Sequence, residues 1–304
     1  MWLFLAFLSA ALLGFYDTFK KKSLAGNAVV PVLFLNTLFC SLIFLPLIVL
    51  SASTNLLDGS VFHVGGGGWE MHKFILLKSV IVLSSWLFGY IGMKHLPLTI
   101  VGPINATRPV MVLVGALLVF GERLNAWQWA GVLVAVVSFF MLSRSGKKEG
   151  IRFGHNKWIA CIVAAAVLGA ISGLYDKFLM AGPQDGGVGL DRMAVQSWYN
   201  IYQTGLMAIM LIVFWWPRRR EQPLRWQWSI LCISVFLSMA DFVYFYALSI
   251  PDAMISIVSM VRRGSVLVSF LFGALLFHEH NLKAKTIDLS LVLLSMILLF
   301  IGSR

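Results

Sequence analysis

The sequence predicts an all-α integral membrane protein with ten transmembrane helices, arranged as two inverted five-helix repeats. The prediction depends on a low charged content, ten apolar stretches of helix length, and motifs that recur in order. Of the 304 residues, 59% are hydrophobic and 12% are charged, and the mean hydropathy is +0.85. A soluble domain carries roughly 25% charged residues, so this chain lacks the polar surface that water requires.

Ten apolar stretches of the chain are long enough to cross a membrane as helices. A helix that crosses a bilayer needs roughly 20 mainly apolar residues. Pro97 and Pro251 separate neighbouring stretches that would otherwise run together. Lys20, Lys21 and Lys22 follow the first apolar run, so that run is not predicted to be a cleavable signal peptide. The ten predicted spans are 2–19, 28–50, 73–94, 98–121, 125–143, 157–181, 193–216, 226–250, 252–277 and 284–302.

The two halves of the chain share an ordered set of motifs. Because each half holds an odd number of spans, the second half must enter the membrane from the opposite side, as in many secondary transporters. We therefore predict a first repeat at 1–143, a basic linker at 144–156 and a second repeat at 157–304. The recurring pairs are Tyr16-Asp17 with Tyr175-Asp176, Tyr90 with Tyr244, Pro97 with Pro251, Arg108 with Arg262, and GALLVFGE with GALLFHE.

The lysines and arginines between the spans indicate the topology. They are concentrated in the loops that follow the odd-numbered spans, which predicts that 144–157 and 217–225 are cytoplasmic and that both termini lie outside. The expected location is a bacterial-type cytoplasmic (inner) membrane, crossed many times. The net charge of +11 occurs as short basic runs beside apolar stretches, which suits lipid headgroups, so nucleic-acid binding is not predicted.

These features resemble the drug/metabolite transporter superfamily, and within it the ten-helix EamA-like families. The resemblance rests on the two halves, the string VGPINATRPV in span 4, and the FGE and FHE ends of spans 4 and 9. It implies alternating-access transport of a small polar organic metabolite, such as an amino acid, an amine or a nucleotide sugar. Members are often drawn with both termini cytoplasmic, whereas the charge distribution here places them outside.

The expected function is therefore a secondary-active or facilitative transporter. The alternative within the same fold is a flippase for lipids or lipid-linked sugars, and a more remote one is an integral membrane enzyme. The histidines fall in loops or at span ends, and no nucleophile–base motif or set of metal ligands occurs, so no enzyme, metal or cofactor is predicted. No nucleotide-binding motif occurs either. The drive would be a coupling ion such as a proton, or the gradient of the solute itself.

Charged residues within spans mark the candidate site, because a charge in hydrocarbon is costly unless it meets a partner or a hydrated cavity. Five basic residues accompany three acidic ones: Lys78, Arg108, Lys177, Arg262 and Arg263 against Asp17, Asp176 and Asp241. The excess positive charge suggests a solute with a carboxylate or phosphate. The predicted solute-binding residues are Arg108, Asn105, Arg262, Arg263, Asp241, Tyr244 and Trp86.

A structural role is the alternative for several of these charged residues. Arg108 either binds an anion in bidentate fashion or pairs with an aspartate on a neighbouring helix. Asp241 is expected to pair with Arg262 or Arg263, which point in directions about 100° apart, leaving the other arginine for solute. Lys78 is expected to reach the membrane interface.

The remaining predictions concern the repeated motifs. The Tyr-Asp pairs, Tyr16-Asp17 and Tyr175-Asp176, either act as gates at the two ends of the pathway or cap their helices symmetrically. Small residues at helical spacing are expected to let helices pack closely. They are Ala6, Ala10 and Gly14 in span 1 and Ala165, Gly169 and Gly173 in span 6.

Overall fold

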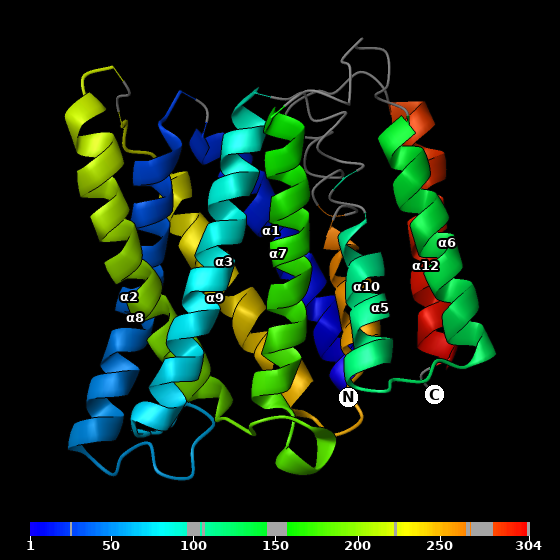
Figure 1. The fold of residues 1–304 in the computed structure, drawn as a ribbon, viewed down its shortest axis with the longest axis horizontal. Coiled ribbons are helices and arrows are strands. Elements are labelled where there is room, and N and C mark those ends of the chain that lie inside the picture. The colour runs from blue at the N-terminus through cyan, green and yellow to red at the C-terminus, as the bar shows by residue number, and fades with distance from the viewer. Residues whose placement is uncertain are drawn as a thin grey trace.

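The computed structural model describes residues 1–24, 26–95, 104, 107–144, 157–221, 224–265, 268 and 282–302, with a few helix side chains left undescribed. Within these ranges all regular structure is helical (Figure 1). The α-helices are α1 (Trp2–Leu24), α2 (Val29–Ser53), α3 (Trp69–His95), α5 (Arg108–Val119), α6 (Ala126–Arg144), α7 (Lys157–Met180), α8 (Arg192–Met210), α9 (Trp228–Ser249), α10 (Ile255–Arg262) and α12 (Leu282–Gly302).

Each predicted span overlaps one of these helices, although α5 and α10 cover only 12 and 8 residues of their spans in the described part of the chain. Five helical segments are long and apolar enough to cross a membrane: α1, α2, residues 69–89 of α3, α7 and α9. Large apolar side chains remain exposed, such as Phe4 at 69% and Leu118 at 80%. Such exposure would be unfavourable in water and is expected for a surface in contact with lipid. The predicted all-helical membrane class is confirmed.

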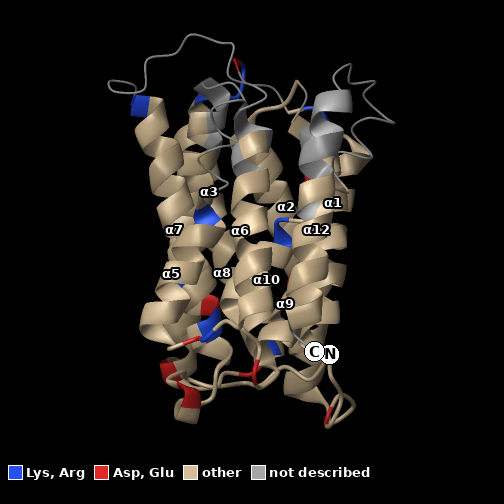
Figure 2. Cartoon of the chain, turned by 90° about the vertical axis from the view of Figure 1, so that its right-hand side faces the viewer, with Lys and Arg blue, Asp and Glu red and all other residues tan. Residues whose placement is uncertain are grey.

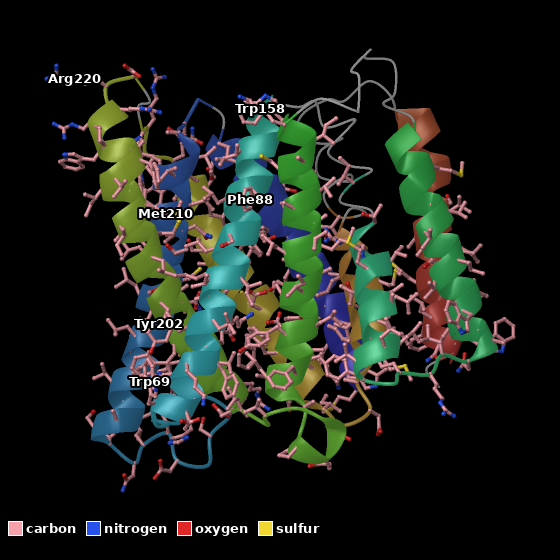
Figure 3. The ribbon with its side chains drawn as sticks, in the orientation of Figure 1. Trp69, Phe88, Trp158, Tyr202, Met210 and Arg220 are labelled. Atoms are coloured by element: carbon pink, nitrogen blue, oxygen red, sulfur yellow. The ribbon has the colours of Figure 1, made fainter. Side chains whose placement is uncertain are left out.

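The helices stand side by side with their connections at the two ends (Figure 1). Trp69 marks one end, together with both termini, and Arg220 marks the other (Figures 1 and 3). We refer to these as the Trp69 end and the Arg220 end. Figure 2 shows that charged residues gather at the ends and that few occur along the middle of the bundle.

The helix pairings follow a pattern. Helix α1 packs along α9 and against α10, whereas α7 packs along α3 and against α5. Helices α2 and α8 contact each other, as do α5 and α10, and α6 and α12 form a separate pair at one edge (Figure 1).

The small residues of α1 pack closely, as predicted. Ala6 is fully buried, and a Cβ atom at Gly14 would lie 2.9 Å from the carbonyl oxygen of Ser265. Gly173, the equivalent of Gly14 in the second half, has more room, because its Cβ would lie 3.7 Å from Val112 Cγ2. Glycine thus lets α1 approach the chain beyond α10 more closely than any residue with a side chain would.

The seventh span ends differently from the prediction. Helix α8 stops at Met210, and a π-helical turn, η3 (Leu211–Trp215), and a 3₁₀ turn, η4 (Trp216–Arg218), follow it. Pro217 has no amide hydrogen to donate to an earlier carbonyl, so a regular α-helix cannot continue through it undisturbed.

Candidate functional site

A cavity of about 410 Å³ lies within the bundle, and its walls come from α1, α3, α5, α7, α8, α9 and α10. Seven of the eight charged residues predicted within spans line it; Lys177 does not. An unpredicted residue, Lys20, joins them because α1 continues to Leu24, beyond the predicted end at residue 19. The charged lining residues are Asp17, Lys20, Lys78, Arg108, Asp176, Asp241, Arg262 and Arg263.

Lys78 and Asp176 form a buried ion pair between α3 and α7. Lys78 is 2% exposed and Asp176 is 6% exposed, and the Tyr244 hydroxyl donates to the second carboxylate oxygen of Asp176 at 3.1 Å. The Lys78 ammonium also lies 4.5 Å from the ring centroid of Tyr199 and 4.9 Å from that of Phe245. Both carboxylate oxygens of Asp176 therefore have partners, which a buried charge requires.

The prediction that Lys78 reaches the membrane interface is wrong. Helix α3 begins at Trp69, four residues before the predicted start of the span, so Lys78 lies nine residues along the helix. At 1.5 Å per residue this is about 14 Å from the helix start, beyond the reach of a lysine side chain. The carboxylate of Asp176 satisfies the ammonium inside the bundle instead.

Asp241 pairs with Arg262, which is one of the two predicted pairings. A guanidinium nitrogen of Arg262 donates to Asp241 Oδ1 at 3.0 Å, and the guanidinium lies 3.8 Å from the ring centroid of Tyr244. Tyr244 thus connects the two charge pairs, since it contacts Arg262 through its ring and Asp176 through its hydroxyl. The four charges and this tyrosine form one continuous polar wall.

Arg263 is the arginine left for other partners. It lines the cavity, and no described residue forms a hydrogen bond or ion pair with its guanidinium. Its nearest opposite charge is Asp17, which also lines the cavity and is exposed. The prediction that pairing Asp241 with one arginine frees the other agrees with this arrangement.

Arg108 is the first residue of α5, and its partner is a backbone group. Its guanidinium donates to the Gly169 carbonyl of α7 at 2.7 Å. Gly169 makes the contact possible, because a Cβ there would lie 2.6 Å from Arg108 Nε. The alternative of an ion pair with an aspartate is not realised among the described residues. A guanidinium held by one carbonyl keeps its net charge and further donors for a ligand.

The other predicted site residues divide into three groups. Trp86, predicted to bind solute, lines the cavity, and so do Tyr16 and Asp17, which were predicted as a gate or a helix cap. Tyr175 does not line it; its hydroxyl donates to the Phe74 carbonyl at 3.2 Å, so this tyrosine joins α7 to α3 instead. Asn105 lies outside the described residues, and so do the linker residues 145–156.

Some lining residues were missed from the sequence. Ser259 precedes Arg262 and Arg263 by about one helical turn, and this spacing could have revealed it. Ser172 of α7 lies four residues before Asp176 and could have been found in the same way. Lys20 was assigned to a loop because charged residues close to a span end are usually interfacial.

The cavity is asymmetric along the bundle. Helix α1 runs from the Trp69 end to the Arg220 end, so Asp17 and Lys20 lie in the half near Arg220 (Figures 1 and 3). Helix α7 runs in the opposite direction, which places Asp176 near the Trp69 end. The Lys78–Asp176–Tyr244 cluster, in which both carboxylate oxygens have partners, therefore lies toward the Trp69 end. Asp17 and Arg263 line the cavity.

Comparisons with known proteins agree with this architecture. A search of curated proteins gave no match. Twenty-nine solved chains match, and one crystal structure superposes with a TM-score of 0.68 at 15% identity, covering 100% of this chain and 96% of its own. Such low identity shows a shared fold alone. Residues 1–144 match the EamA-like transporter family. This family, which forms part of the drug/metabolite transporter superfamily, is thus the one that the first 144 of the 304 residues resemble.

Proposed function

We propose that the chain is a secondary-active or facilitative transporter that carries a small polar organic metabolite with a carboxylate or phosphate group. Transport would proceed by alternating access between two inverted five-helix halves, residues 1–143 and 157–304. The match of residues 1–144 to the EamA-like transporter family supports a membrane transporter and a small-molecule solute. The observation that carries the proposal is the charge of the cavity, where five basic residues face three acidic ones.

Two of the three acidic residues in the cavity lining are neutralised by basic partners. Lys78 neutralises Asp176, and Arg262 neutralises Asp241. Leaving Lys20 aside, Asp17 remains for Arg108 and Arg263, so the lining keeps an excess of about one positive charge away from bulk water. An anionic solute would compensate for this excess. A guanidinium can hold a carboxylate or phosphate through two parallel hydrogen bonds, and Arg263 has no protein partner in the described part of the chain.

The size and lining of the cavity fit a small organic molecule. Ligand pockets commonly measure roughly 300–1,000 Å³ and combine apolar walls with a few placed polar groups. Trp86 and Tyr16 supply aromatic surface beside the arginines. A carbon skeleton packed on these rings would leave its anionic group near Arg263 and Arg108.

The helix pairings support two inverted repeats with ten crossings. Exchanging α1 with α7, α2 with α8, α3 with α9, α5 with α10 and α6 with α12 turns each main contact into another that is present. The α1–α9 contact becomes α7–α3, and α1–α10 becomes α7–α5. The α2–α8, α5–α10 and α6–α12 contacts map onto themselves. Two such halves can rock about one central cavity and open it to either side.

We place the Arg220 end in the cytoplasm of an inner membrane. Arg218, Arg219 and Arg220 are exposed there, and the Arg219 guanidinium lies 4.4 Å from the Trp216 ring centroid. Trp226 and Trp228 are 52% and 73% exposed in the same region. Arginines flanked by exposed tryptophans are typical of a cytoplasmic interface. A proton or another coupling ion would supply the drive if transport is active.

A thermal-shift screen of the purified protein tests the solute class. A bound solute stabilises the folded protein, so carboxylates or phosphates, but not their neutral amides or alcohols, should raise the melting temperature. Arg263→Gln should then weaken the affinity of the best compound by roughly 10- to 150-fold, the loss of one hydrogen bond to a charged group, about 1.5–3 kcal/mol.

Arg192→Gln provides the matched control. Arg192 is also a half-buried arginine, stacked 4.1 Å from the Tyr246 ring centroid, but it does not line the cavity. It should leave the affinity unchanged. Stabilisation by neutral compounds alone, or wild-type affinity in Arg263→Gln, would show that the solute is not bound through its anionic group.

A further inference from the structure

A second cluster of charged residues lies at the Trp69 end, beyond the cavity. Glu122 follows α5, and its carboxylate accepts the backbone N–H groups of Ile255 at 2.7 Å and Ser256 at 3.2 Å. The Ser256 hydroxyl donates to the same carboxylate. All three bonds join the end of α5 to the first turn of α10, the helix that carries Arg262.

Helix α10 depends on this distant carboxylate. The residue before it, Met254, offers no side-chain cap, and its first turn contains no acidic residue. The first N–H groups of a helix have no partner within the helix and carry partial positive charge, so a carboxylate stabilises them. Glu122, from the first half of the chain, supplies that carboxylate.

Lys177 ties a third helix to the same place. Its ammonium donates to the Ala253 carbonyl at 2.6 Å, and its charge interacts with that of Glu122. Lys177 belongs to α7, one residue after Asp176. Lys177, which the sequence analysis counted among the charged residues within spans, thus contacts the segment that leads into α10.

These contacts lie directly behind the cavity wall. The Ile255 side chain lines the cavity, while its N–H group is bound by Glu122. On the neighbouring helix, Asp176 lines the cavity and Lys177 binds Ala253. Opening the cavity toward the Trp69 end would require α10 to move away from α5 and α7, and this movement would break both sets of bonds.

We propose that the Glu122–Ser256 and Lys177–Ala253 contacts form a latch that keeps the Trp69 end of the cavity closed and breaks in each transport cycle. This inference rests on the proposed alternating-access function. Contacts made in one conformation and lost in the other bias the equilibrium between them, so a weaker latch increases the population of the opposite state. Glu122 acts as a positioning residue and has no contact with the solute.

Cysteine labelling tests the latch without knowledge of the solute. In a variant lacking Cys40, Cys161 and Cys232, Ser259→Cys places a reporter on the cavity wall of α10. A membrane-impermeant maleimide is applied to either face of reconstituted vesicles. Asp185→Cys, exposed at the Trp69 end, identifies the face that is being labelled.

The expected result is a change confined to one face. Glu122→Gln should raise the rate of labelling at position 259 from the Trp69 face by roughly tenfold, the ratio given by a 1.4 kcal/mol change in a two-state equilibrium. Ser256→Ala removes only the hydroxyl contact and should change the rate in the same direction by less. It also serves as the test variant if Glu122→Gln does not fold.

Asp191→Asn is the matched control. Asp191 also caps a helix at the Trp69 end, where its carboxylate accepts the Ala194 N–H at 2.7 Å, but it belongs to α8. It should leave the labelling at position 259 unchanged. The latch is refuted if Glu122→Gln and Ser256→Ala label at the parental rate, or if Asp191→Asn accelerates labelling equally. If Glu122→Gln changes the labelling rate but no anion stabilises the protein, the proposed class of solute is refuted and the latch is not.

Discussion

Asp17 and Asp176 occupy equivalent places in the two halves, yet their surroundings differ. Asp176 is 6% exposed, and both of its carboxylate oxygens have partners, from Lys78 and Tyr244. Asp17 is exposed to the cavity, and its carboxylate interacts with the charges of Lys20, Arg263 and Arg262 without a hydrogen bond to any described residue. The same motif thus produces a closed ion pair in one half and an open acidic group in the other.

The sequence explains this difference. The offset that aligns Arg108 with Arg262 aligns Lys78 of α3 with Cys232 of α9. The second half therefore has no lysine to neutralise Asp17 as Lys78 neutralises Asp176. An internal repeat preserves the framework of two halves, while a single unmatched residue gives them different electrostatic environments. If the two halves alternate as proposed, we expect the conformations open to either side to differ in free energy.

Among variants that compare the surroundings of Asp17 and Asp176, the largest loss of stability is expected when Lys78 is replaced. Lys78→Met leaves Asp176 buried without its cation, which should lower the free energy of unfolding by about 3–5 kcal/mol. Denaturant or thermal unfolding in detergent measures the loss. The double variant Lys78→Met, Asp176→Asn removes both charges and should recover most of the lost stability. A double variant as unstable as the single one would show that packing, not charge pairing, dominates this site.

A smaller effect is expected at the equivalent glycines. Gly14→Ala brings a Cβ to 2.9 Å from the Ser265 carbonyl oxygen, so the neighbouring backbone must shift, at about 1–3 kcal/mol. Gly173→Ala places its Cβ 3.7 Å from Val112, an ordinary contact, and should cost little. Melting temperatures of the two variants give the comparison. Equal losses would mean that both halves are packed with the same tolerance.

The smallest effect is expected at Asp17 itself. Asp17→Asn should lower the free energy of unfolding by about 1 kcal/mol or less, the range measured for ion pairs that remain in contact with water. Asp176→Asn is the matched control, and should be far more destabilising because it leaves the Lys78 ammonium buried without a carboxylate. The two variants are compared by thermal unfolding in the absence of solute. Similar losses would abolish the distinction between the two halves.

Much of the fold was predictable from composition and length. Apolar runs of about 20 residues predict helices in lipid because every backbone polar group must then be satisfied internally. The helix ends were less predictable. Helix α1 continues through Lys20 to Leu24, and α3 begins at Trp69, because charged and aromatic residues remain compatible with a helix at the interface. A prediction from hydropathy alone ends each span at the first polar residues, although the helix can continue beyond them.

The membership of the candidate site was predictable, but the partners within it were not. The cost of charge in hydrocarbon correctly selected Arg108, Asp241, Arg262 and Arg263 as cavity residues. Which arginine meets Asp241 depends on how α9 and α10 rotate against each other, and one sequence contains no such information. Lys78 was misassigned for the same reason, since its partner lies 98 residues away on another helix.

The bond between Glu122 and Ser256 also has a consequence for biogenesis. It joins residues 134 positions apart, so the carboxylate is synthesised and inserted long before the helix that it caps. Met254, the residue before α10, provides no side-chain cap, so Glu122 satisfies the first N–H groups of this helix. We expect this part of the second half to complete its folding against the first half. The dependence runs in the direction of translation, and the carboxylate is in place when α10 emerges.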